Sequence, residues 1–215
     1  MRTRREHEGL RVFRFAPLAG VVFVALTVVA VLGLGGDTPD IDSSPQEVAA
    51  FFSAHSGREE GAASLLAIAV VFLVFFGASL CTALRPPGRG SDGWSKVAFG
   101  GVLVASAGFL VAAAVRLAIA EAADKHVPAA AVQALNALDN AAFLPFASGL
   151  GIMLLGAAGA MIGMAGVMRG LGWAALIIAI VLFTPLGELG FFASGIWIIL
   201  ASFALFSMPR AERPA

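Results

Sequence analysis

The chain has 215 residues, of which 59% are hydrophobic and only 13% are charged, and its formal net charge is zero. A soluble domain carries about 25% charged residues, whereas the apolar residues here come in blocks of about 20, the length that crosses roughly 30 Å of hydrocarbon. This composition excludes an ordinary soluble protein. It predicts an all-α membrane protein, because each helix satisfies its own backbone hydrogen bonds in lipid.

Side chains that carry chemistry are sparse. The single cysteine, Cys81, allows no intrachain disulfide and no thiolate cluster. The three histidines lie far apart, and none has the i, i+4 spacing of a helical metal site. The sequence contains no glycine-rich phosphate loop and no H-E-x-x-H or G-x-S-x-G motif. We therefore expect no catalytic residues, no metal and no cofactor.

Six apolar segments follow one another in a single membrane domain, and we predict that each is a transmembrane helix. They lie at about 15–36, 62–84, 97–119, 141–167, 171–187 and 189–208, between an N-terminal tail at 1–14 and a C-terminal tail at 209–215. The first segment exceeds the roughly 7–15 apolar residues of a signal-peptide core. It therefore predicts an uncleaved membrane anchor.

Lysine and arginine are distributed unequally between the two predicted sides of the membrane. With the N-terminus inside, the inner segments hold eleven of the 14 basic residues, whereas ten of the 14 acidic residues fall in the outer segments. Segments rich in lysine and arginine stay in the cytoplasm. We therefore predict that both termini are cytoplasmic.

An amphipathic helix is predicted in the first outer loop, over residues 45–57. Ser44 and Glu47 form the Ser-x-x-Glu pattern of a capping box, with Pro45 at the first helical position, and Gly57 is expected to end the helix. One face carries Val48, Phe51, Phe52 and His55. That face can rest in the membrane interface, bind a partner, or form a lid over an outward-facing cavity with the two phenylalanines and the histidine turned inward.

Polar residues gather where several predicted spans reach the outer side. They are Arg116, Glu121, Asn136, Asp139, Asn140 and Glu188. In a structural interpretation, Arg116 extends to the interface or pairs with Glu121 or Asp139 and holds the bundle together, since a charge near the interface costs far less than the about 2.5–3.5 kcal/mol at the bilayer centre. In a functional interpretation, these residues line an outward-facing pocket for a small ligand or an ion.

Glycines form a stripe along the fourth predicted span. The stripe consists of Gly149, Gly156, Gly159, Gly163 and Gly166, and it continues to Gly170. Glycine lets two helix backbones approach closely, which matters in lipid because no hydrophobic force drives helices together there. We predict that the first five of these glycines pack this span against another helix of the same chain rather than against a second copy.

Three motifs resemble those of a family of six-span actinobacterial membrane proteins with no established activity. They are D-x-S-P-x-E-V-A-A-F-F-S-A-H-S-G-R at 42–58, ALNALDNAAF at 134–143 and R-G-L-G-W at 169–173, although the proline that often precedes the tryptophan in that family is missing here. The resemblance implies a protein of the bacterial plasma membrane. It supplies no catalytic residues.

The function predicted from these observations is non-enzymatic. The protein would be a structural or accessory subunit, or would bind a lipid or a small ligand at its extracytoplasmic face. The alternative is a small transporter or channel whose outer vestibule is formed around Arg116, Asp139 and Glu188. Membrane lipids are the expected partners, together with other membrane proteins or further copies of the chain. Nucleic acid is not expected, because no basic groove with interleaved aromatic residues is present.

Overall fold

The computed structural model describes residues 15–35, 38–85, 92–125 and 127–208. The helical segments are η1 (Ala16–Leu18), α2 (Ala19–Val28), η2 (Val29–Gly35), α3 (Pro45–Ala83), α4 (Asp92–Asp124), α5 (Ala129–Ala141), α6 (Phe143–Met161), α7 (Val167–Leu182) and α8 (Gly187–Ser207). Turns and short loops connect them. The predicted all-α fold is therefore confirmed for the described part of the chain. The predicted tails at 1–14 and 209–215 lie outside it.

Five helical segments are long and apolar enough to cross a membrane. They are Ala16–Gly35, Pro45–Ala83, Gly93–Asp124, Ala129–Met161 and Gly187–Ser207. The sixth apolar helix, α7, has 16 residues and extends for about 24 Å at 1.5 Å per residue, somewhat less than the roughly 30 Å of a hydrocarbon core. It begins at Val167, four residues before the predicted start of the fifth span.

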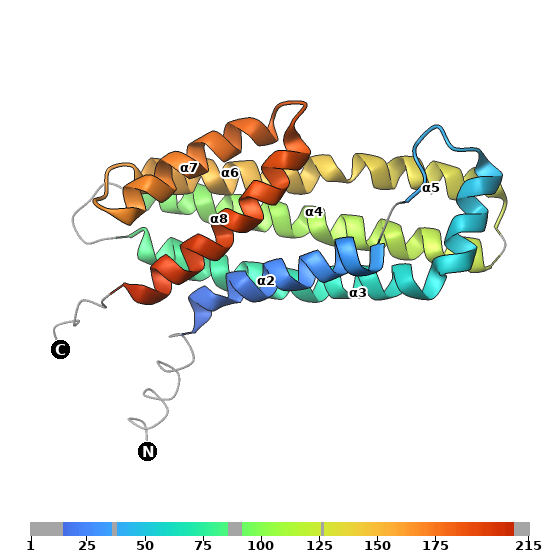
Figure 1. Cartoon of the computed structure of the whole chain (residues 1–215), viewed down its shortest axis with the longest axis horizontal. Helices are drawn as coiled ribbons and strands as arrows, with labels where there is room; N and C mark the ends of the chain where they lie inside the picture. The colour runs from blue at the N-terminus through green and yellow to red at the C-terminus, as the bar shows by residue number, and fades with distance from the viewer. Residues whose placement is uncertain (1–14, 36–37, 86–91, 126, 209–215) are drawn as a thin grey trace, which may run out of the picture.

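The helices form a closed ring in which neighbours in the sequence lie side by side (Figure 1). α4 packs between α3 and α6, α7 packs on α6, and α8 packs on both α7 and α2, which in turn packs on α3. Phe15, just before η1, stacks on Phe206 of α8 with ring centroids 6.1 Å apart. Toward the opposite end of the bundle α2 and α8 diverge (Figure 1). The candidate site lies where they separate.

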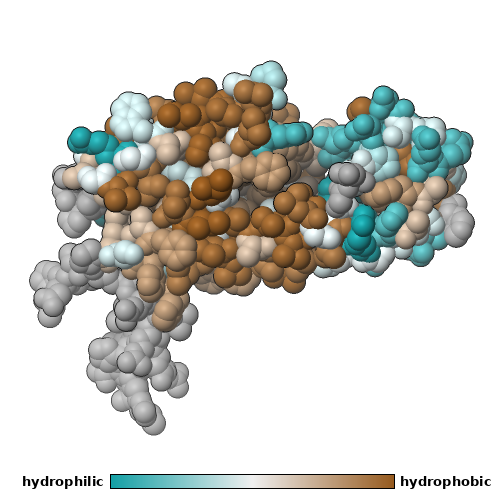
Figure 2. All heavy atoms as spheres, in the orientation of Figure 1, coloured by the Kyte–Doolittle hydropathy of each residue, from teal (hydrophilic) through white to brown (hydrophobic). Residues whose placement is uncertain are grey.

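The bundle contains two hydrophobic cores. The larger core fills the body of the bundle and includes Leu73, Met153 and Trp197, all fully buried. The smaller core joins α3, α4 and α5 at one end through Val48, Phe52, Val115, Ile119, Ala123 and Val132. We call this end the cap and define it as residues 45–58 of α3, 115–124 of α4 and all of α5. Figure 2 shows polar surface concentrated on the cap and mostly hydrophobic surface over the body.

The predicted helix at 45–57 forms, and it is interrupted at His55, two residues before the predicted end at Gly57. His55 has a non-helical φ of −123° and ψ of 15°, and beyond this kink α3 takes another direction and runs to Ala83 (Figure 1). In this second part of α3, Glu59, Leu66 and Leu73 are buried and follow one another at intervals of seven residues along one face.

The start of α3 has the predicted capping box. The backbone N–H of Ser44 donates to Glu47 Oε2 at 3.0 Å, and the backbone N–H of Glu47 donates to the Ser44 hydroxyl at 3.4 Å. The hydrogen bond from the Ser44 backbone, assisted by that from its hydroxyl, lowers the pKa of the exposed Glu47 carboxyl. A charged Glu47 therefore supports the first turn of α3 near neutral pH.

α4 and α6 approach each other through glycines on both helices. Gly149 and Gly156 of α6 lie against the α4 backbone, and Gly101 and Gly108 of α4 lie against the α6 backbone. A Cβ added at any of these positions would overlap backbone atoms of the facing helix. On each helix the two glycines are two turns apart and face the same way. Close backbone contact is thus built into both sides of this interface.

The remaining glycines of the predicted stripe behave differently. A Cβ at Gly159 would meet the ring of Trp94, so this glycine makes room for a side chain rather than for a helix backbone. α6 ends at Met161, before Gly163 and Gly166, and a Cβ at either would meet no atom within 4 Å. The prediction that these two pack helices together is therefore wrong. Gly166 instead has φ +63° at the turn into α7, a conformation that favours glycine.

Candidate functional site

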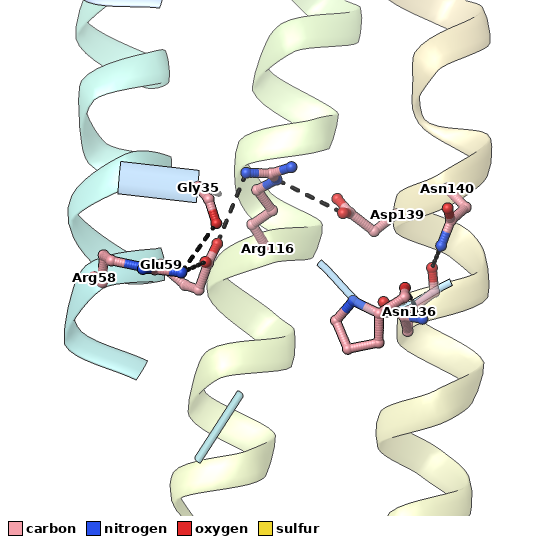
Figure 3. Close-up of polar contacts among 8 residues, drawn as sticks. Gly35, Arg58, Glu59, Arg116, Asn136, Asp139 and Asn140 are labelled. Atoms are coloured by element: carbon pink, nitrogen blue, oxygen red, sulfur yellow. Dashed lines mark hydrogen bonds and ion pairs between the residues drawn. The ribbon is translucent and has the colours of Figure 1, made fainter. Parts of the chain in front are cut away.

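An arginine lies between two acidic residues where the cap meets the body (Figure 3). Nη1 of Arg116 on α4 is 3.7 Å from Oε2 of Glu59 on α3, and its Nε is 3.6 Å from Oδ2 of Asp139 on α5. The side chains of Glu59, Arg116 and Asp139 are 0%, 17% and 9% exposed. Within the described residues, no hydrogen bond reaches Arg116 Nη1 or either carboxylate oxygen of Glu59. Electrostatic attraction, which is stronger here than in water, therefore holds Glu59 to Arg116.

The end of the first helix joins the same cluster. Arg58 of α3 donates from Nη2 to the carbonyl oxygen of Gly35 at 3.3 Å, and this nitrogen is also 3.9 Å from Glu59 Oε1 (Figure 3). Arg116 lies directly against Gly35, since a Cβ added there would be 2.7 Å from Arg116 Nη1. Segments η2, α3, α4 and α5 thus meet around one guanidinium group.

Amide side chains of α5 hold the loop that follows the first helix. Asn136 Nδ2 donates to the carbonyl oxygen of Pro39 at 3.1 Å, and Gln133 Nε2 donates to that of Ser43 at 3.0 Å. Asn140 Nδ2 donates to the backbone oxygen of Asn136 at 2.9 Å. Asn136 is buried. These contacts join the loop to the cap and fix its path beside Arg116.

A cleft of about 320 Å³ lies beside the ion cluster, where α2 and α8 diverge. Its apolar wall includes Phe109, Phe143, Phe146, Phe191 and Phe192. The rings of Phe109 and Phe146 stack with their centroids 4.7 Å apart. Its polar wall consists of Thr38, Arg116, Asp139, Asn140 and Glu188. The cleft therefore combines a large aromatic surface with charged groups.

The structure divides the predicted polar cluster into three parts. Arg116, Asp139, Asn140 and Glu188 line the cleft, Asn136 is buried beside the loop, and Glu121 is exposed on α4, where it pairs with Lys125 of the same helix at 3.4 Å. The pairing of Arg116 with Asp139 is present at 3.6 Å. The suggested pairing with Glu121 is not made, because Glu121 lies more than one turn beyond Arg116 and binds Lys125.

The three predicted lid residues belong to the cap. Phe52 is buried in the smaller core, and Phe51 packs at its edge. Nδ1 of His55 donates to the Phe51 carbonyl oxygen at 2.8 Å, and the two rings are 4.6 Å apart. Among the described residues that line the cleft, none comes from 45–57. The structure therefore places this segment on top of the bundle and does not use it as a wall of the cleft.

Glu59 is the member of the site that the sequence analysis missed. Its buried position follows from the seven-residue spacing of Glu59, Leu66 and Leu73 on one face of α3 beyond the kink. The predicted start of the second span at residue 62 left Glu59 outside that face. A charged residue on an otherwise apolar stripe is the signal that could have identified it.

Comparisons with protein-family models, curated proteins and solved structures gave no match to this chain. The resemblance to six-span actinobacterial proteins therefore stays a prediction. Fold and site together define a helical bundle whose apolar helices are compatible with a multi-pass membrane protein and whose described part contains an amphipathic cleft.

Proposed function

We propose that this chain is a non-enzymatic protein of the bacterial plasma membrane that binds a lipid or another amphiphile at its extracytoplasmic face. The observation that carries this proposal is the cleft between η2 and α8, in which five phenylalanines lie beside the charged side chains of Arg116, Asp139 and Glu188. Binding sites for small molecules are mostly apolar, with a few polar groups that fix orientation. An alkyl chain suits the aromatic wall, and a polar head group suits the charged wall.

The length of α4 supports a position for this cleft at one membrane surface. Arg116 lies about 33 Å along the helix from Trp94, close to the roughly 30 Å thickness of the hydrocarbon core. Trp94 on α4 and Trp173 on α7 are about half exposed, as is typical of tryptophan at a membrane interface. With Trp94 at one interface, Arg116 reaches the other and the cap projects into water. The bias of lysine and arginine supports an extracytoplasmic cap and cytoplasmic termini.

The position of the cleft on the side of the bundle favours a ligand from the membrane. η2 and α8, between which it lies, carry exposed apolar side chains such as Leu32, Leu189 and Ile196. The aromatic wall would thus face hydrocarbon, and the charged wall would lie at the level of lipid head groups. Ligand binding is favoured over a purely structural or accessory role because a packed structural interface would not require this cleft.

A small transporter or channel is the second candidate. The observation that favours it is that Arg116, Asp139 and Glu188 line one cleft. Deeper in the body, however, Val102, Leu150 and Met153 are at most 1% exposed. Continuous labelling of engineered cysteines along α4 by a water-soluble reagent would support a pathway, whereas labelling that stops near Arg116 would support a closed bundle.

Lipid retention tests the proposed function. The full chain is purified in uncharged maltoside micelles, and co-purifying lipid is quantified by mass spectrometry. Ala112→Leu narrows the cleft from α4, and Ala114→Leu adds the same atoms at an exposed position of that helix outside the cleft. We expect Ala112→Leu to lose most of the bound lipid and Ala114→Leu to retain it. Equal lipid content in both variants and in the original protein would contradict the proposal.

A further inference from the structure

We propose that the cleft selects an amphiphile whose head group is positively charged, as an alkylammonium group is. This inference rests on the proposed function, since it names the chemical class of the head group for the same cleft. It depends on three features: the net charge of the polar wall, the exposed Glu188 carboxylate that no basic side chain of the described residues pairs with, and the aromatic rings beside Glu188.

The polar wall carries one more negative than positive charge. Arg116 contributes one positive charge to the lining, whereas Asp139 and Glu188 contribute two negative charges. Arg116 is already engaged, because Asp139 lies 3.6 Å away on one side and the buried carboxylate of Glu59 lies 3.7 Å away on the other. An anionic head group that approached Arg116 would also approach Asp139 and be repelled by it. The cleft is therefore a poor site for a phosphate or sulfate group.

Glu188 supplies the negative charge that no basic side chain balances. It is exposed, and within the described residues its side chain makes no ion pair and no hydrogen bond. It lies in the first turn of α8, where the helix dipole favours a negative charge. A cationic group in the cleft would therefore find a charged, accessible carboxylate.

Aromatic rings lie next to this carboxylate. Phe192 follows Glu188 by one helical turn, and both residues line the cleft. Phe143 lies against the start of α8, since a Cβ added at Gly187 would be 3.2 Å from its ring. The face of an aromatic ring attracts a cation, and quaternary ammonium groups are recognised in this way. The same rings offer no attraction to a sulfate. An ammonium group would therefore be attracted both by the Glu188 carboxylate and by the aromatic rings beside it.

Photolabelling with matched amphiphiles tests this inference. Three diazirine-bearing amphiphiles with equal alkyl chains and trimethylammonium, sulfate or hydroxyl head groups are added to the full chain in maltoside micelles. Cross-linked peptides are then located by mass spectrometry. Labelling near Phe191 is normalised to labelling near Ile177, which is exposed on α7 and outside the cleft. We expect the ammonium compound to exceed the uncharged hydroxyl compound by about fivefold, the size expected for one unit charge at a water-exposed site, and to exceed the sulfate compound by more, because the carboxylate repels the sulfate.

Two variants assign that preference to its source. Glu188→Gln should remove most of the preference for ammonium, whereas Glu60→Gln, which removes an exposed carboxylate of α3 outside the cleft, should retain it. Equal labelling of the cleft by all three compounds would overturn the head-group inference and leave amphiphile binding intact. A preference for sulfate, or an unchanged preference in Glu188→Gln, would also overturn it. Labelling no stronger than that near Ile177 for every compound would overturn the proposed function itself.

Discussion

Arg116 faces carboxylates from two different helices, and the burial of these groups decides what each contact contributes. Glu59 is fully buried, and Asp139 is nearly so. Removing such charges from water is costly, and their attraction to the arginine offsets that cost without necessarily exceeding it. The cluster is therefore weak support for overall stability when intact. Loss of one partner strongly destabilises the protein, because a buried charge is then left unpaired.

Substitution of Arg116 measures how much stability is lost when one partner of this cluster is removed. We expect Arg116→Leu to lower the free energy of unfolding by about 3–5 kcal/mol, because it leaves Asp139 without its counter-ion and Glu59 with only the more exposed Arg58, 3.9 Å away. Glu59→Gln should cost less, since Arg116 keeps Asp139. Unfolding in detergent micelles provides the measurement. The matched control is Lys125→Leu, which breaks the exposed pair with Glu121 and should cost below about 0.5 kcal/mol. Similar decreases in the free energy of unfolding for Arg116→Leu and Lys125→Leu would contradict the structural role of the cluster.

The members of this cluster differ in how far they could be predicted from the sequence. Arg116 and Asp139 stand out because each interrupts or borders an apolar segment at similar predicted depth. Glu59 does not stand out, because it lies in the run Arg58–Glu59–Glu60, which reads as an ordinary polar stretch. Only the direction that α3 takes beyond its kink turns Glu59 inward while Glu60 stays exposed.

At the scale of helices, α3 joins two structural units that the sequence analysis treated as separate. Its first turns build the cap, and its remainder belongs to the body. The kink at His55 lies between Phe52 of the smaller core and Glu59 of the ion cluster. The change of direction at this kink lets the first turns of α3 lie across the end of the bundle while the remainder runs along it (Figure 1).

The interface between α4 and α6 offers a test at the same scale, because two adjacent glycines of α4 have different surroundings. A Cβ at Gly101 would overlap the backbone of Met153, whereas one at Gly100 would meet nothing within 4 Å. We expect Gly101→Ala to lower the free energy of unfolding by about 1–3 kcal/mol through overpacking. Gly100→Ala should be neutral or stabilising by up to about 1 kcal/mol, because alanine is the better helix former. Equal effects on unfolding in micelles would show that close backbone contact does not stabilise this interface.

For the whole molecule, the long helices exceed the thickness of a membrane. α3 beyond its kink, at residues 56–83, and α4, with 33 residues, extend for about 42 and 50 Å, against roughly 30 Å of hydrocarbon. The excess lies in the cap, which has its own core and a polar surface (Figure 2). The shorter hairpin of α7 and α8 covers only part of this length (Figure 1). The proposed cleft therefore lies at the step between the hairpin and the cap.

Cysteine labelling in intact cells tests the proposed orientation. In a Cys81→Ser background, Glu121→Cys places a thiol on the exposed cap, and Gly170→Cys places one at an exposed position near the start of α7, at the opposite end. A membrane-impermeant maleimide should label the first in intact cells and the second only after permeabilisation, because the bias of lysine and arginine places the cap outside. The reverse pattern would invert the topology. It would also move the cleft to the cytoplasmic face.

Apolar segments of membrane-spanning length, a helical fold and the capping box at Ser44 could be derived from the sequence alone, because each depends on local composition or on spacing within one segment. The tertiary structure decided which of these segments meet. It paired Gly101 and Gly108 with Gly149 and Gly156, brought Glu59 to Arg116, and opened a cleft where α2 and α8 diverge. These contacts join residues far apart in the chain. They depend on the lengths, crossings and rotations of whole helices, which no single segment encodes.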